Sequence, residues 1–149
     1  MTDISLETTL ELRDACLCMV VQRAARALAR RFDDAFRPLG LTNGQFSLLM
    51  SINRPQPAAM GIVAEFLAMD RTTLTAALKP LLRRRLVRIL ADPADGRARL
   101  LALTTNGKKL LARAVPIWRA HHRTLERELG RPARVLRNEL HQLSQGRRE

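Results

Sequence analysis

Short hydroxyls and long cations gather on one side of a segment that is predicted to be helical. Asp70 is a typical helix N-cap, and the apolar residues after it recur at helical spacing, so they share one face. Small hydroxyls and cations on the other face suit close approach to base edges and phosphates in a DNA major groove. The packing face comprises Leu74, Ala77, Leu78, Leu81 and Leu82, and the polar face comprises Arg71, Thr72, Thr73, Thr75, Ala76 and Lys79.

A basic hairpin is predicted directly after this helix. Residues 86–90 and 99–103 are strand-like, and residues 92–97 between them are rich in turn formers. Arg97 and Arg99 would lie at its tip, from which they can reach an adjacent minor groove. Residues 71–99 hold eight cations and two acids, which is half of the net charge of +12 of the chain. The alternative is a helix and a hairpin that are only solvated. We favour a DNA-contacting surface, because the helix suits a major groove and the hairpin tip suits a minor groove.

The composition of the whole chain favours a polyanionic partner. Of 26 cations in 149 residues only Lys79, Lys108 and Lys109 are lysines, and arginine suits the recognition of phosphates and base edges. Nucleic acid is the first candidate partner, and an anionic membrane surface is the second. Aromatic residues make up 3% and there is no tyrosine, which argues against a stacking platform for single strands.

The sequence lacks the motifs that are typical of membrane proteins, enzymes and metal-binding proteins. The chain has the length of one domain, no apolar run long enough to span a membrane, and an acidic, polar start, so we expect a cytoplasmic protein. It has no nucleophile elbow, phosphate loop or metal-ligand spacing, and His121 and His122 would point apart on a helix. We therefore expect no enzyme, cofactor or metal. A helical protein that binds only other proteins is the remaining alternative.

The elements around the basic region are predominantly helical. We predict one continuous helix over residues 6–36, a stop at Pro38 and Gly40, and a helix capped by Thr42 with Gln45 in a capping box. An extended link over residues 54–57, a short helix over 61–68, a long helix over 105–129 and a last helix to residue 143 complete the chain. The long terminal helices carry apolar stripes that one small domain cannot cover, which predicts pairing with a second copy.

The order of these elements and several motifs resemble the MarR family of transcriptional regulators. The resemblance implies a mainly α fold with a small β-hairpin wing (α+β), namely a winged helix-turn-helix over residues 41–104. It also implies an N-terminal dimerisation helix over 1–40 and C-terminal dimerisation helices over 105–149. Such homodimers bind palindromic double-stranded DNA operators, often as repressors, and many are released by small aromatic or organic acids. The motifs are Asp70-Arg71-Thr72-Thr73-Leu74-Thr75, Lys79-Pro80-Leu81, Leu86-Val87, Asp92-Pro93-Ala94-Asp95-Gly96-Arg97, Leu103-Thr104 with Gly107, and Leu39-Gly40-Leu41-Thr42 with Gln45-Phe46.

We call the polar face of residues 71–79 and the hairpin tip with Arg97 and Arg99 the reading surface, and the helix that carries this face the reading helix. The resemblance assigns roles to individual residues of this surface. Thr73, Thr75 and Lys79 match groove or phosphate positions, Arg97 matches the wing-tip arginine, and Asp95 matches an acid that orients the wing. Arg85 stands where the family usually has a helix-ending glycine, so a left-handed backbone there would be strained. Ala76, Ala77 and Ala94 replace polar residues that are common in the family.

A small-molecule pocket is expected from the resemblance, between the dimer helices and the winged domain. Arg23 follows the apolar stripe of the first helix and could bind the carboxylate of an organic anion. The alternative for Arg23 is an ion pair with an acid such as Glu7 or Asp33. The candidate walls are Cys16, Met19, Val20, Arg23, Phe46, Met50 and Trp118.

Thiol-based redox sensing by Cys18 or Cys16 is the alternative mechanism. Cys18 falls on the reactive cysteine of the organic-hydroperoxide branch of the family, although Gln22, Phe32 and Asn43 replace the tyrosines of that branch. On a continuous helix, residues two apart lie about 200° from each other, so Cys16 and Cys18 could not bridge without unwinding. The alternative is a purely structural role, in which both cysteines act as small apolar side chains.

Overall fold

The computed structural model describes residues 3–145 and shows a mainly helical protein with a small antiparallel sheet, as predicted. Residues 1–2 and 146–149, the ends of the two predicted dimerisation segments, lie outside the described residues. The elements are α1 (Leu6–Ala15), α2 (Leu17–Phe36), the 3-10 helix η1 (Arg37–Leu39), α3 (Asn43–Ile52), β1 (Ala58–Ala59), α4 (Met60–Phe66), α5 (Arg71–Arg83), β2 (Val87–Ala91), β3 (Arg99–Leu103), α6 (Thr105–Glu128) and α7 (Ala133–Gln145).

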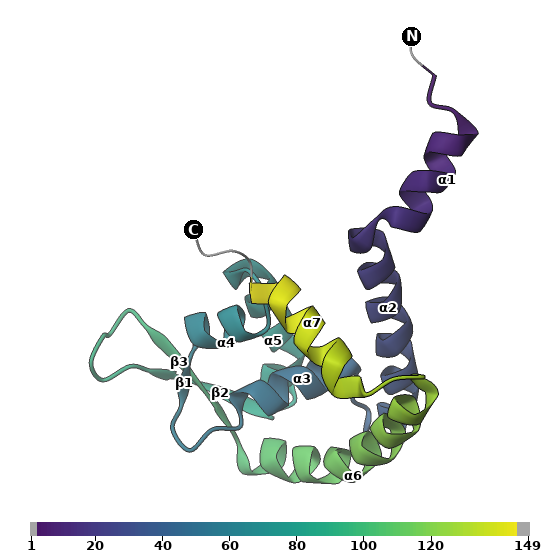
Figure 1. Cartoon of the computed structure of the whole chain (residues 1–149). Coiled ribbons are helices and arrows are strands. Elements are labelled where there is room, and N and C mark those ends of the chain that lie inside the picture. The colour runs from purple at the N-terminus through teal and green to yellow at the C-terminus, as the bar shows by residue number, and fades with distance from the viewer. Residues whose placement is uncertain (1–2, 146–149) are drawn as a thin grey trace.

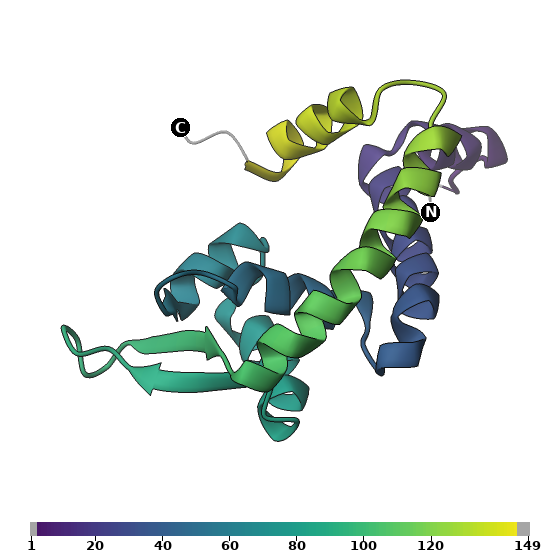
Figure 2. The ribbon, with the colours of Figure 1, turned by 90° about the horizontal axis from the view of Figure 1, so that it is seen from below.

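The long helices and the hairpin lie at opposite ends of the molecule. The second half of α6 runs beside α2, and α7 turns back after it (Figures 1 and 2). The β2–β3 hairpin projects from the other end, while α3, α4 and α5 lie between the two. The helix α1 continues from α2 and points away from the rest of the chain (Figure 1).

One apolar core joins the helices to the sheet. Phe36 at the end of α2 is fully buried and its ring stacks on Phe46 of α3 at a centroid distance of 4.7 Å. Leu74, Leu78 and Leu81 of α5 are buried in the same core, so the predicted packing face of this helix is confirmed. The core therefore fixes which side of α5 remains exposed.

Side-chain caps set the starts of α3, α5 and α6, and the first two of these caps were predicted. The Oγ1 of Thr42 accepts from the N–H of Gln45 at 3.1 Å, and Gln45 Oε1 accepts from the N–H of Thr42, which completes the capping box. Asp70 caps α5 and Thr104 caps α6 in the same manner, each through the N–H three residues ahead. These side chains satisfy amide groups that a helix start leaves without partners.

The sheet has a third strand that the sequence pattern does not indicate. Its order is β1-β3-β2, with Ala58 opposite Leu101 and Val87 opposite Leu103. Only an extended link was expected before α4, because two alanines carry no strand signal of their own. The exposed edge of β3 supplies the partner, so long-range pairing creates β1 and anchors the start of α4.

The prediction of one helix over residues 6–36 is wrong, because the chain leaves the helical conformation at Cys16. Its backbone is extended, with φ −72° and ψ 101°. No residue of α1 is buried, so packing within residues 3–145 does not hold a continuous helix across this point.

Candidate nucleic-acid interface

The outer face of α5 presents the predicted reading residues to solvent. Arg71, Thr72, Thr73, Thr75 and Lys79 are all exposed, on the side opposite the buried leucines. The Thr75 hydroxyl donates to the carbonyl of Arg71 at 2.8 Å and keeps its lone pairs for an incoming donor. The face is therefore free of protein cover along its whole length within the described residues.

Asp70 fixes the start of this helix. Its Oδ1 accepts from the N–H of Thr73 at 2.7 Å, and this hydrogen bond holds the pKa of Asp70 below its usual value. The carboxylate therefore remains ionised at neutral pH and occupies the positive end of the helix dipole. It also sets the rotation of the first turn, which carries Arg71, Thr72 and Thr73.

The end of α5 has the left-handed backbone at Arg85 that was considered from the sequence as a source of strain. Arg85 has φ 54°, and the N–H groups of Arg85 and Leu86 donate to Leu82 and Leu81 at 3.0 and 2.9 Å. These two bonds form a Schellman motif, which usually needs glycine at the left-handed position. Thr104 secures the turn, since its Oγ1 donates to the carbonyl of Arg85 at 2.7 Å. The end of α5, the start of the wing and the start of α6 are therefore hydrogen-bonded to one another at this turn, which we call the joint.

Two polar contacts at the base of α2 were not anticipated from the sequence. The Nη1 of Arg84 donates to the carbonyl of Gly40 at 2.7 Å, and the N–H of Asn43 donates to Oδ1 of Asp33 at 2.6 Å. The first joins the end of α5 to the turn after α2, where Gly40 has φ 60°. Such pairs carry no local sequence signal, because the partners of the first contact are 44 residues apart.

The wing is a hairpin whose tip is shaped by aspartates. Asp92 Oδ1 accepts from the N–H of Ala94 at 2.9 Å, and Asp95 Oδ1 accepts from the N–H of Arg97 at 3.0 Å. Asp95 therefore orders the backbone that carries Arg97. The side chains of Arg97 and Arg99 are exposed.

The cations of this surface are not neutralised by neighbouring carboxylates. None of the eight cations between residues 71 and 99 forms an ion pair with another residue of 3–145. Closely spaced positive charges without partners raise the electrostatic potential of a surface, which attracts a polyanion. The outer face of α5 and the wing tip are therefore positively charged and exposed.

The predicted pocket residues are spread over several places in the protomer. Val20 and Arg23 line a cavity of about 470 Å³ along α2, whereas Trp118 lines a different one of about 450 Å³ on α6. Phe46 belongs to the core, Met50 is 44% exposed, and Met19 is half-buried. Arg23 forms no ion pair with any residue of 3–145, so the alternative pairing with Glu7 or Asp33 is not observed.

The two cysteines lie at the break between α1 and α2. Both thiols are free and exposed. The Nε2 of Gln22, which takes the place of a tyrosine in the hydroperoxide branch, donates to Sγ of Cys18 at 3.1 Å. Because Cys16 is not helical, the helical separation of about 200° expected for residues two apart does not hold here.

Two other kinds of site are absent from residues 3–145. No helix in this range is at once long and apolar enough to cross a lipid bilayer. The same range holds no cluster of three or more histidine, cysteine or acidic side chains arranged to bind a metal ion.

Known proteins are similar to this chain in both sequence and fold. The sequence profile of the MarR family matches residues 39–98. The transcriptional regulator HosA of Escherichia coli O111:H- is 35% identical over 77 residues, which span 52% of this chain and 57% of HosA.

The similarity to solved structures extends over most of the chain. The Mycobacterium tuberculosis transcriptional regulator MosR, solved in complex with DNA, is 39% identical with a TM-score of 0.79, over 87% of this chain and 94% of that one. The transcriptional repressor CouR, solved with a 23-mer DNA duplex, is 27% identical with a TM-score of 0.72, over 95% and 96% of the two chains. On its sequence profile, its fold and these relatives, the chain belongs to the MarR family of winged-helix transcriptional regulators.

Proposed function

We propose that this chain is a sequence-specific DNA-binding transcriptional regulator that acts as a homodimer on a palindromic operator, as a repressor. The observation that carries the proposal is the exposed face of α5 with its unpaired cations, placed beside the arginine-tipped wing. The hydroxyls and Lys79 of α5 enter a major groove, and Arg97 and Arg99 of the wing reach the neighbouring minor groove. MosR and CouR have each been solved with DNA, which supports this use of the shared fold.

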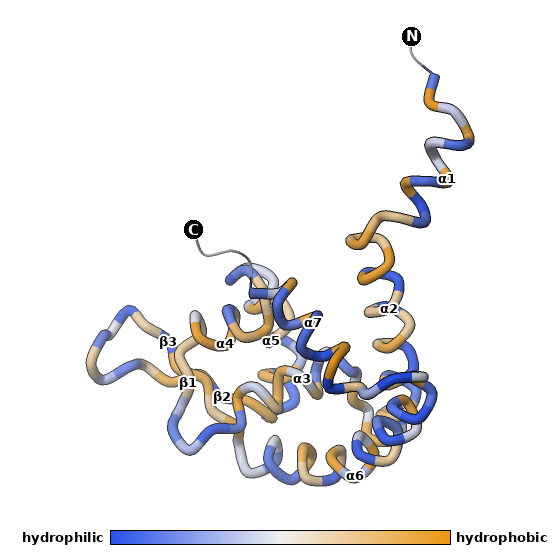
Figure 3. Tube along the Cα trace, in the orientation of Figure 1, coloured by the Kyte–Doolittle hydropathy of each residue, from blue (hydrophilic) through white to orange (hydrophobic). Residues whose placement is uncertain are grey.

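The terminal helices provide the dimer surface in this proposal. Apolar residues, orange in Figure 3, recur along α1, α2 and α7, and many are exposed in the single protomer. Leu6 is 72% exposed, Leu17 66% and Leu143 60%, a pattern typical of a surface covered by a second copy. Two-fold pairing would place two α5 helices about 34 Å apart, one turn of DNA.

The effector in this proposal is a small aromatic or organic acid that binds between the dimer helices and the winged domain. Arg23 supports the proposal because its guanidinium has no carboxylate partner within residues 3–145 and lines a concave surface with Val20. A second protomer would add the remaining walls. Quenching of the single tryptophan, Trp118, by a panel of aromatic acids would detect such a ligand.

Selection of bound sequences from a random duplex pool tests the DNA-binding proposal. We expect a palindrome with half-sites about 10 base pairs apart and a particle of twice the 16.8 kDa chain mass. Thr73→Val, which removes one hydroxyl of the reading face, should change the selected half-site, whereas Thr105→Val on α6 should not. A pool without symmetric enrichment, or no duplex binding at low salt, would refute the proposal.

Redox sensing by Cys18 or Cys16 is a second candidate function, favoured by two free, exposed cysteines at the break between α1 and α2. One thiol would reduce a hydroperoxide, releasing an alcohol and leaving a sulfenic acid. The other thiol would attack that sulfur, forming a disulfide and releasing water. Closure of this short ring would change the course of the chain between α1 and α2.

Peroxide treatment distinguishes the two candidates. If the cysteines are sensors, peroxide should release DNA from the natural chain with loss of two hydrogens in the protein mass, and Cys18→Ser should abolish the release. If the effector is an organic acid, Cys18→Ser should leave acid-driven release intact and peroxide should have no effect on the natural chain. The control is Ser47→Ala, an unrelated half-buried position on α3.

A further inference from the structure

The centre of the outer face of α5 is formed by two small side chains. Thr72 and Ala76 each stand two residues before a buried leucine, Leu74 or Leu78, which puts each about 160° around the helix from that leucine. Both side chains are exposed, and one helical turn separates them. We call Thr72 and Ala76 the methyl pair, because each presents a methyl group. They point away from the core, toward any duplex that α5 meets.

Amide and carboxylate side chains are absent from the sequence of residues 71–79. Asparagine or glutamine pairs with adenine, and aspartate or glutamate accepts from cytosine, so this segment has neither kind of reader. The hydroxyl hydrogen of Thr75 is donated to the carbonyl of Arg71 at 2.8 Å, so this threonine has no hydrogen left for a base. This leaves apolar contact and the hydroxyl of Thr72 as the means of reading a base at the centre of the face.

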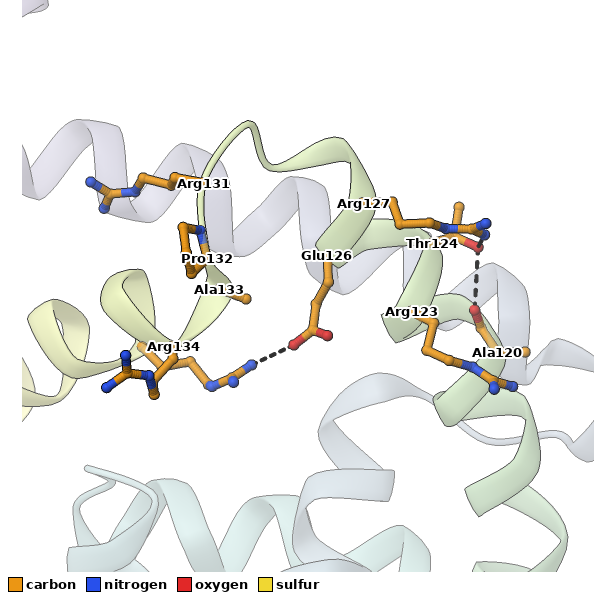
Figure 4. Close-up of a pocket in the computed structure, with 10 residues that line it drawn as sticks. Ala120, Arg123, Thr124, Glu126, Arg127, Arg131, Pro132, Ala133 and Arg134 are labelled. Atoms are coloured by element: carbon orange, nitrogen blue, oxygen red, sulfur yellow. Dashed lines mark hydrogen bonds and ion pairs between the residues drawn. The ribbon is translucent and has the colours of Figure 1, made fainter.

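The long cations of this segment stand away from the centre of the face. The guanidinium of Arg71 lies beside the first turn of α4, with Nη2 3.7 Å from the position that a Cβ atom on Gly61 would take. Lys79 lies about two turns after Arg71 along the helix. By contrast, long charged side chains crowd the end of α6, where Arg137 is paired with Glu126 (Figure 4). The centre of the α5 face is therefore open to the close approach of a base pair.

Thymine is the base that suits such a surface. Its C5-methyl group is the apolar group that a base presents in the major groove, and the methyl groups of alanine and threonine contact it. Ala76 has no polar atom in its side chain, so a base can meet only its methyl group. The methyl pair spans about 6 Å along the helix and stacked bases lie about 3.4 Å apart, so the pair can contact thymines up to two base steps apart.

We propose that the methyl pair determines specificity by recognising thymine in each half-site through its C5-methyl group. This inference rests on the proposed DNA binding, and it adds which base the centre of α5 selects and by which chemical group. Arg71 and Lys79 bind phosphates on the two sides of the pair. Thr73 lies on the flank of the face beside its cap Asp70 and is not part of the pair.

Two random duplex pools test this inference, one normal and one with uracil in place of every thymine. Uracil pairs with adenine but lacks the C5-methyl group. The duplex most enriched from the normal pool should lose about fourfold in affinity for each contacted thymine that is changed to uracil, the effect of one buried methyl group. Equal affinities for the thymine and uracil forms of that duplex would overturn the inference and leave the DNA-binding function standing. Binding of neither pool would refute both.

Variants at Thr72 separate methyl contact from hydroxyl contact and from an effect of uracil on the shape of the duplex. Thr72→Val keeps a methyl group and loses the hydroxyl, and it should still prefer thymine over uracil at every position. Thr72→Ser keeps the hydroxyl and loses the methyl group, so it should lose this preference at one base pair of each half-site. Thr105→Ser, at the exposed first residue of α6, is the matched control and should discriminate as the natural chain does. All three should keep the natural circular dichroism spectrum. If Thr72→Ser also discriminates as the natural chain does at every position, the preference comes from duplex shape and the inference is wrong.

Discussion

Replacing Gly107 with alanine should destabilise the joint between the reading helix and α6. Gly107 lies in the first turn of α6 and is buried against the backbone of Leu86. A Cβ atom added there would stand 2.1 Å from the carbonyl oxygen of Leu86 and 3.0 Å from its carbonyl carbon. Since the obstacle is backbone and not a flexible side chain, α6 must move relative to the end of α5 to make room.

The size of the effect follows from two opposing contributions. Alanine stabilises a helix by about 0.5–1 kcal/mol over glycine, whereas overpacking a well-packed site costs about 1–3 kcal/mol and occasionally more. A contact as short as 2.1 Å lies at the upper end of that range. We therefore expect a net loss of about 2 kcal/mol in the free energy of unfolding, with weaker DNA binding because Leu86 lies in the turn that ends α5.

Urea denaturation followed by circular dichroism measures this loss. With a slope of about 2 kcal/mol per molar urea, the midpoint of Gly107→Ala should fall by about 1 M. Gly44→Ala is the matched control, because Gly44 also lies in the first turn of a helix but its nearest neighbour would be 4.0 Å from an added Cβ. That control should be stabilised slightly. A Gly107→Ala chain as stable as the control would refute the reasoning.

Three further changes test other parts of the interface. Arg97→Ala should weaken binding to every duplex and flatten the dependence of log affinity on log salt by about one, measured by titration at several salt concentrations; an unchanged slope would show that the wing tip does not contact phosphate. Asp70→Ala should lower the thermal stability at neutral pH, and because the pKa of Asp70 is lowered by the N–H of Thr73, the stabilisation is present above about pH 4 and is lost as the pH falls below it. Melting curves of the two proteins should therefore converge in acid, and a constant difference would contradict the cap. Arg85→Gly should raise the stability by about 1 kcal/mol, since it relieves the left-handed backbone, while Arg83→Gly at the last residue of α5 should lower it.

Features that depend on neighbouring residues could be predicted from the sequence. The caps at Thr42, Asp70 and Thr104 each involve a side chain and an amide three residues away, so a short motif contains both partners. The exposed and buried faces of α5 follow from helical periodicity, and the aspartates of residues 92–97 indicate the tight turns of the wing. For this reason the exposed face of α5 could be predicted residue by residue, while the contact of these residues with DNA stays a prediction.

Features that depend on distant partners could not be predicted. The strand β1 exists because β3 offers an edge, and the contact of Arg84 with Gly40 exists because two turns meet in space. The helix break at Cys16 has the opposite cause, since apolar periodicity continues across it while no residue of α1 is buried by the part of the chain that the structure describes. The predicted pocket residues lie at separate places in one protomer, because that prediction came from the resemblance and assumes a second copy.

The exposure of α1 has a consequence for how its backbone amides exchange with solvent. A ten-residue helix with no buried residue is too short to be stable in water by its own hydrogen bonds. In a lone protomer its amide protons should therefore be replaced by deuterium almost as fast as those of an unfolded peptide, long before those of α3 or α5. Slow deuterium uptake in α1 would then be a direct measure of how much time this segment spends against another chain.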